Sequence, residues 1–193
     1  HPEKELNNKY SANVVDICPV GAITDKDFRF KCRVWYLKKA DSICPGCARG
    51  CNIEIHYNLE RPQHGEGERV MRLKPRENPE VNQWWICDAG RYGYKFIDEN
   101  RISEPAARDQ ESIKEVSWEG ILEAGASLMR ETQQSIGIFL SPQMSNEELY
   151  LAKKLFGSGT KFQVFLLSPH PAGDQDDFLI RSDKHPNRKG AEW

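Results

Sequence analysis

Four cysteines in two segments carry the strongest chemical signal in this sequence. Three of them lie within eight residues and the fourth follows after a long interval, which gives the spacing C-x2-C-x3-C-x35-C for Cys44, Cys47, Cys51 and Cys87. Three thiolates on one short loop can reach three corners of an iron–sulfur cluster, and the fourth ligand then comes from a segment folded against that loop. Gly46 and Gly50 lie between the ligands, where the backbone has to pass close to the cluster.

Two other uses of these cysteines have to be weighed against a [4Fe–4S] cluster. Structural zinc sites with four cysteine ligands usually take two well-separated C-x2-C pairs, whereas here three cysteines crowd one loop. Disulfides are the weaker alternative, because six cysteines in 193 residues do not make a disulfide-dense scaffold. The spacing favours an iron–sulfur cluster and leaves a zinc-stapled scaffold domain as the alternative.

The elements that position the cysteines are predicted to be mainly strands. Alternating apolar and polar residues predict a strand over 28–34, with Cys32 in a core position rather than as a ligand. Residues 53–73 read as a β-hairpin with a long, charged, Pro/Gly-containing loop. The pair Trp84 and Trp85 is expected to pack in the core of this small domain and to shield the site from water.

Beyond residue 100 the pattern changes to alternating helices and strands. Ser117 is placed to cap a helix whose apolar face comprises Trp118, Ile121, Leu122, Leu128 and Met129. Apolar runs at 136–140 and 162–167 predict buried strands, and the helix between them begins with the capping box of Ser145 and Glu148 and ends at Gly157. This β-α-β order predicts parallel strands. Neither strand is followed by a glycine-rich phosphate-binding motif.

Composition excludes several classes of protein. The formal net charge is −2, so no overall basic bias points to nucleic acid. No apolar run approaches the ~20 residues that a membrane-spanning helix needs, and we expect no direct membrane insertion. The chain begins at His1 rather than Met, so we expect the true N-terminus to lie upstream, and the lack of a signal peptide says little about compartment.

The cysteine motif and its surroundings resemble a known family. The segments 42–52 and 85–91 are similar to the [4Fe–4S] domain of the molybdopterin oxidoreductase superfamily, and within it to the large iron–sulfur subunit of respiratory complex I, the 75 kDa-type subunit. The resemblance implies an α+β chain that is an internal fragment of a longer subunit. It comprises the remnant of a ferredoxin-like domain (1–36), a small β-rich cluster domain (37–100) and the start of an α/β domain with parallel strands (101–193).

The resemblance also implies a function and partners. The chain is expected to be an electron-transfer subunit of NADH:quinone oxidoreductase, not catalytic on its own, that works with other subunits of a respiratory complex. Its location would be the cytoplasmic face of the inner membrane in a bacterium, or the matrix side in a mitochondrion. Cys18, within a Cys-Pro-x-Gly-Ala segment, would supply the last ligand of a second [4Fe–4S] cluster whose other ligands lie upstream of His1.

One residue bears on the choice between complex I and a molybdenum enzyme. Members of the superfamily that work with molybdenum or tungsten typically have lysine two residues after the last cysteine, where this chain has Ala89. We therefore expect no molybdopterin, and a molybdopterin-dependent oxidoreductase such as a formate dehydrogenase remains the alternative. In the polar tail, Asp174, Asp176, Asp177 and Asp183 are interpreted as a solvated acidic loop rather than a cation site.

Overall fold

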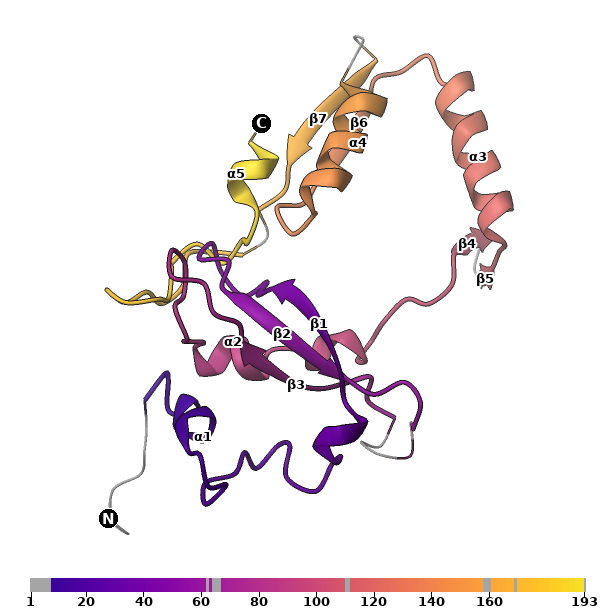
Figure 1. The fold of residues 1–193 in the computed structure, drawn as a ribbon. Coiled ribbons are helices and arrows are strands. Elements are labelled where there is room, and N and C mark those ends of the chain that lie inside the picture. The colour runs from indigo at the N-terminus through magenta and orange to yellow at the C-terminus, as the bar shows by residue number, and fades with distance from the viewer. Residues whose placement is uncertain are drawn as a thin grey trace.

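The computed structural model describes residues 8–61, 63, 67–109, 112–157, 161–168 and 170–192. Its first half is built on an antiparallel sheet in the order β1 (Lys38–Ile43), β2 (Asn52–Tyr57) and β3 (Val70–Pro75). The hairpin expected over 53–73 is confirmed by the pairing of β2 with β3, although part of its long loop lies outside the described residues. Figure 1 shows this sheet in purple, with the short helix α2 beside it.

The first strand of this sheet is not the one that alternation predicted. The prediction of a strand over 28–34 was wrong, because residues 26–31 form turns and Val34–Tyr36 a single 3₁₀ turn, η1. Phe30 is 90% exposed and has a positive φ of 71°. No described strand lies beside this segment, so its backbone has no partner with which to form a sheet. β1 instead consists of mostly polar, exposed residues that pair along the outer edge of β2.

The core of this half lies under β2 and β3. Ile53, Leu73 and Ile86 are almost fully buried and pack in one cluster with the side chains of Cys44 and Cys51. Tyr94 closes the cluster on the side of η2 (Lys95–Ile97), and its hydroxyl donates to the backbone carbonyl of Met71 at 3.1 Å. Two of the cysteines of the motif are therefore part of the hydrophobic core.

Trp84 and Trp85 divide between surface and core. Trp84 is 63% exposed, so the expectation that both tryptophans pack inside is wrong for this residue. Trp85 lies against the core cluster and meets the ring of Phe178 edge to face, with ring centroids 5.6 Å apart. Phe178 belongs to the C-terminal tail, so the contact ties the tail to the cysteine-bearing half.

Two short helices are joined by buried polar contacts. α1 (Asn13–Ile17) places the Asn13 amide against the backbone of Ile86, donating to its carbonyl at 2.7 Å and accepting from its N–H at 3.2 Å. Arg91, on α2 (Asp88–Tyr92), is 4% exposed and donates to the Asp16 carboxylate at 2.5 Å. These contacts fasten the helix before Cys18 to the segment that carries Cys87.

The second half contains the predicted parallel pair of strands. β6 (Ile136–Leu140) and β7 (Phe162–Leu166) pair in parallel, and α4 (Asn146–Phe156) lies between them in sequence. The Ser145–Glu148 capping box is formed and Gly157 is the C-cap, as expected. A short antiparallel hairpin of β4 (Ala106–Asp109) and β5 (Ser112–Glu115) precedes these elements and was not predicted. Together with the first sheet, this arrangement confirms an α+β chain.

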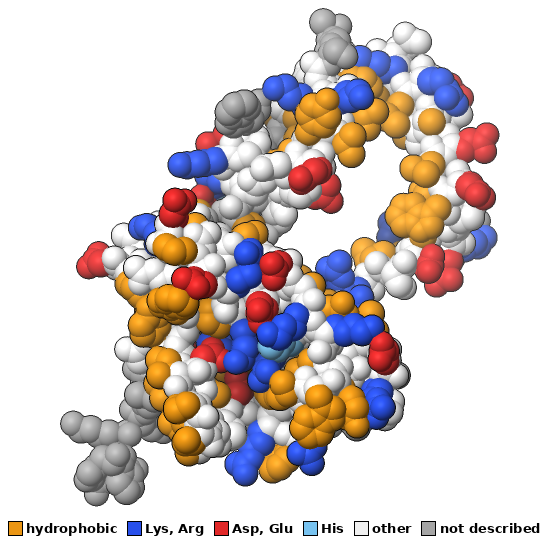
Figure 2. All heavy atoms as spheres, in the orientation of Figure 1, with side chains coloured by type: hydrophobic (Ala, Val, Ile, Leu, Met, Phe, Trp, Pro, Cys, Tyr) orange, Lys and Arg blue, Asp and Glu red, His pale blue; other side chains and the backbone are white. Residues whose placement is uncertain are grey.

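The helix α3 (Trp118–Glu131) has the amphipathic pattern expected and the Ser117 cap, but little covers its apolar face. No residue of α3, all of which is described, is buried, and Trp118, Leu122 and Leu128 are each more than 60% exposed. Figure 2 shows hydrophobic side chains gathered along this helix. No helix in the described ranges is long and apolar enough to cross a bilayer.

Candidate metal centre

The loop between β1 and β2 brings three cysteines onto one turn. Cys44 follows the last residue of β1 and Cys51 precedes the first residue of β2, and the pairing of Ile43 with Asn52 sets the two cysteines side by side. The Cys44 N–H donates to the carbonyl of Cys51 at 2.8 Å and closes the loop. Gly50 has a φ of +63°, which an L-residue adopts only with strain.

Cys87 reaches the same place from the other side of the core. It is the N-cap of α2, and its sulfur accepts a hydrogen bond from the Gly90 N–H at 3.3 Å. A Cβ added to Gly90 would lie 3.1 Å from the sulfur of Cys44 and 3.4 Å from that of Cys87. The remote cysteine thus lies near the first one, with Gly90 between their sulfurs.

All four cysteines of the motif line one cavity of about 200 Å³. Ile86, Ala89 and Gly90 form part of its wall, and the tail residues Leu179, Ile180 and Lys184 form another part. Leu179 is 2% exposed and Ile180 is 8% exposed, although both belong to a segment expected to be a polar loop. The apolar Phe178-Leu179-Ile180 run within that polar tail was the available sequence signal for this wall, and it was missed.

Burial makes these thiols poor acids. Desolvation, reinforced by the neighbouring cysteines, raises the pKa of Cys44 to about 11 and the pKa of Cys51 to about 12. Burial raises the pKa of Cys87 as well, opposed by the hydrogen bond from Gly90. Thiolates are stable in such a cavity only when a positive metal group binds them, because a metal site takes its cysteine ligands deprotonated.

The lining of the cavity suits a cluster, because small residues lie among the four thiols. A zinc ion requires its four sulfurs at about 2.3 Å from one point. Among the described residues, no group of three or more His, Cys, Asp or Glu side chains converges to hold a single metal ion. The four thiols surround a cavity instead, with small residues between them, and this donor set suits a [4Fe–4S] cluster.

Cys18 and Cys32 lie apart from this cavity, which neither lines in the described part of the chain. Cys18 follows α1, and hydrogen bonds from the backbone N–H groups of Ile23 and Val20 to its sulfur lower its pKa. A lowered pKa favours the thiolate form that a cluster ligand needs. The ligand role of Cys18 itself stays a prediction. Cys32 is half-buried on an irregular segment, and its sulfur accepts from the Asn58 side-chain amide at 3.6 Å.

The acidic residues of the tail organise the tail itself. The Asp176 carboxylate accepts from the backbone N–H groups of residues 178–180 and from the Tyr10 hydroxyl. Asp183 pairs with Arg188 at 2.5 Å and with the buried His185 at 2.7 Å. The carboxylates of Asp176 and Asp183 are therefore engaged in contacts within the protein.

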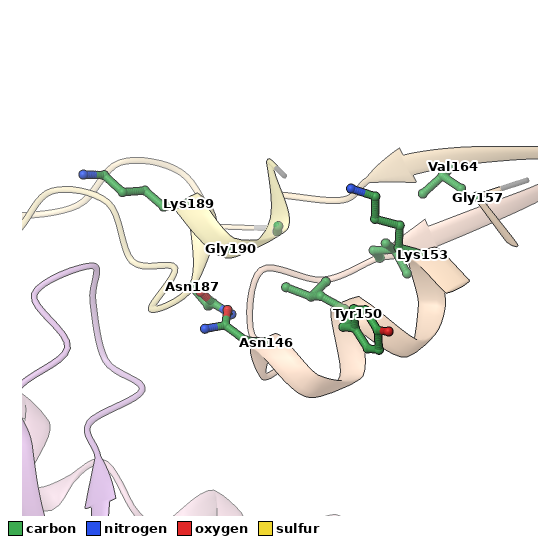
Figure 3. Close-up of a pocket in the computed structure, with 11 residues that line it drawn as sticks. Asn146, Tyr150, Lys153, Gly157, Val164, Asn187, Lys189 and Gly190 are labelled. Atoms are coloured by element: carbon green, nitrogen blue, oxygen red, sulfur yellow. The ribbon is translucent and has the colours of Figure 1, made fainter. Parts of the chain in front are cut away.

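A larger cavity of about 780 Å³ lies between α4, β7 and α5 (Arg188–Ala191), away from the cysteines (Figure 3). Asn146 and Asn187 meet at its edge, where the Asn187 amide donates to the Asn146 side-chain oxygen at 2.9 Å. Its described lining includes Tyr150 and Lys153 but no sulfur. Its residues do not offer the soft ligands that an iron–sulfur cluster needs, so the smaller cavity is the candidate site.

Asn82 fixes the segment that leads to Cys87, and we expect its replacement to be costly. Its buried side chain accepts from the Asn52 N–H at 2.9 Å and donates to the carbonyls of Asn52, Arg76 and Trp85. Asn82→Ala leaves these backbone groups without a partner and should lower the free energy of unfolding by about 1–3 kcal/mol. Urea unfolding measures the change. The exposed Gln133→Ala variant is the control, and equal stability of the two variants would contradict the prediction.

Comparison with known proteins connects this site to described families. Residues 37–99 match the family model of the molybdopterin oxidoreductase Fe4S4 domain. The chain is 36% identical over 151 residues to NADH-quinone oxidoreductase subunit 3 of Thermus thermophilus. The aligned segment covers 78% of this chain and 18% of the relative. It is 32% identical over 172 residues to the NADH-ubiquinone oxidoreductase 75 kDa subunit of Reclinomonas americana, covering 88% of this chain and 24% of the relative.

A third relative is the mitochondrial NADH dehydrogenase (ubiquinone) iron-sulfur protein 1 of Solanum tuberosum, 35% identical over 153 residues, with 79% of this chain and 20% of the relative covered. The chain therefore spans about a fifth of the length of the curated relatives that it matches. The similarity extends beyond the residues that match the Fe4S4 domain model.

Proposed function

We propose that this chain, whose residues 37–99 belong to the molybdopterin oxidoreductase Fe4S4 domain family, is part of an electron-transfer subunit of NADH:quinone oxidoreductase. Cys44, Cys47, Cys51 and Cys87 hold one [4Fe–4S] cluster in this proposal. The observation that carries it is the cavity lined by four thiols from two distant segments. The relatives named as the 75 kDa subunit and as iron-sulfur protein 1 support the respiratory context.

A [4Fe–4S] cluster supplies one-electron exchange when bound, and the residues of this chain set the conditions for it. Ile86 and Leu179, both almost fully buried, give the cavity an apolar wall. The Gly90 N–H already points at the sulfur of Cys87, and such hydrogen bonds stabilise negative charge on the ligand. The protein thereby contributes a position and a reduction potential, and we assign no turnover to the chain on its own.

The same proposal extends to a second site and to partners. Cys18 is a ligand of another [4Fe–4S] cluster whose remaining ligands come from outside this chain. Residues 1–36 are the end of a ferredoxin-like domain. Residues 37–100 form the cluster domain, and residues 101–193 begin an α/β domain. The partners are other subunits of the respiratory complex, in a peripheral position on the cytoplasmic or matrix side. With Ala89 two residues after the last ligand, no molybdopterin is bound.

Metal analysis of the full-length protein, purified anaerobically with the subunits that accompany it, tests the proposal. We expect about four iron and four sulfide ions for the four-cysteine site, and iron–sulfur electron paramagnetic resonance signals that NADH reduces. Stoichiometric zinc with no sulfide would overturn the cluster assignment. Molybdenum or tungsten together with formate-dependent dye reduction would overturn the complex I assignment and leave the cluster intact.

A further inference from the structure

The C-terminal tail closes the cysteine cavity with one charged side chain. Among the described residues that line the cavity, Lys184 alone carries a charge, and the others are cysteine, glycine or aliphatic. Ala89, on the wall of the same cavity, carries none. The tail is held against the cysteine loop by a hydrogen bond from the Ala48 N–H to the carbonyl of Asp183 at 2.9 Å. Lys184 therefore has a defined position relative to the four thiols.

The tail holds the lysine side chain in one orientation. Its ammonium group donates to the carbonyl of Asp174 at 2.6 Å and to that of Arg181 at 2.8 Å. The side chain lies across Gly173, where a Cβ would overlap with the Lys184 Cε. Gly173 is itself fixed by a hydrogen bond from its N–H to the carbonyl of Ser182 at 2.9 Å. These contacts use two of the three ammonium donors and fix the side chain that lines the cavity, with its ammonium group on the tail.

A fixed cation at this place has an electrostatic consequence. A cluster with four thiolate ligands carries net negative charge, which increases by one unit when it accepts an electron. A nearby positive charge therefore stabilises the reduced form more than the oxidised form. Leu179, Ile180 and Ile86 give the cavity an apolar wall, and a charge acts over a longer range beside apolar groups than in open water.

We propose that Lys184 is a positioning charge that raises the reduction potential of the cluster held by the four cysteines. The inference rests on the proposed function, because it requires a redox cluster in the cavity. The proposal assigns a role to the C-terminal tail, because Lys184 lies about one hundred residues after Cys87 in the sequence. The lysine tunes the site and is not a ligand.

Redox titration of charge variants in the purified full-length protein tests this role, with iron content measured for each sample. The signal of this site is the one that disappears in Cys87→Ala. Lys184→Gln should lower its midpoint potential, and Lys184→Arg should keep the potential close to that of the unchanged protein. Lys189→Gln, which removes an exposed charge from the same tail, is the control and should have no effect.

Ala89→Lys provides a second measurement that does not disturb the tail. It adds a charge to the same cavity wall and should raise the potential, both alone and in the Lys184→Gln background. An unchanged potential in iron-replete Lys184→Gln, an equal shift in Lys184→Arg, or no response to Ala89→Lys would each overturn the role of Lys184. Failure of the unchanged protein to bind iron and sulfide would instead count against the proposed function.

Discussion

Replacing Cys87 with Ala or Ser is expected to abolish the [4Fe–4S] signal of this site. Cys87 is the one proposed ligand outside the β1–β2 loop, and it lines the same cavity as the three cysteines of that loop. Its sulfur also caps α2 by accepting from the Gly90 N–H. Serine is a good N-cap, so Cys87→Ser keeps the helix while it replaces the soft thiolate with a hydroxyl that binds iron poorly.

The measurements are iron and sulfide content, visible absorption and electron paramagnetic resonance of anaerobically prepared protein. Cys32→Ala is the matched control, because it removes a half-buried cysteine that does not line the cavity, and it should retain the full signal. An unchanged spectrum in both Cys87 variants would show that the fourth ligand has been assigned incorrectly. Loss of iron in Cys32→Ala would make that residue a ligand.

Breaking the ion pair between α1 and α2 is expected to be the most destabilising change outside the cavity. Arg91 is 4% exposed and donates to Asp16 at 2.5 Å, and Asp16 also pairs with Lys74 at 2.9 Å. Asp16→Ala leaves the guanidinium buried without its carboxylate and should lower the free energy of unfolding by about 3–5 kcal/mol. Replacing both members of the pair, Asp16→Ala with Arg91→Met, should cost less than the sum of the single changes.

The same pair predicts a dependence of stability on pH. Burial opposes ionisation of Asp16, but the hydrogen bond from Lys74 and the charge of Arg91 outweigh it and lower the pKa of the carboxyl below its ordinary value of 3.8. The unfolded chain therefore takes up a proton at a higher pH than the folded protein does. The stabilisation that the charged Asp16 carboxylate gives is complete above its ordinary pKa, and it is lost as the pH falls through the lowered pKa of the folded state.

Urea unfolding at neutral pH and at about pH 3 measures both effects. The difference between the unchanged protein and Asp16→Ala should shrink as the pH falls. Removal of the exposed pair of Lys9 and Asp174, by Lys9→Ala, should leave the unfolding midpoint where it is. A difference for Asp16→Ala that stays constant across this pH range would refute the role of its charge.

The sequence predicted the four cysteines of the site, but not the residues of the C-terminal tail that complete its wall. Cys44, Cys47 and Cys51 are close in the chain, so their spacing alone places them on one loop. The distant Cys87 was assigned by the same motif, and the cavity shows that it lies with the others. Lys184 and Leu179 were not recognised, because a tail residue becomes part of a cavity only through long-range contacts such as the one between Ala48 and Asp183.

The fold shows the same division between local and long-range information. The Ser145–Glu148 capping box, the Gly157 stop and the hairpin of β2 and β3 were determined by sequence, because each depends on residues near one another in the chain. Alternation over 28–34 failed because a strand needs a partner for its backbone hydrogen bonds, and none lies beside this segment among the described strands. The polar β1 became a strand for the converse reason, since β2 provides those hydrogen bonds whatever the side chains are.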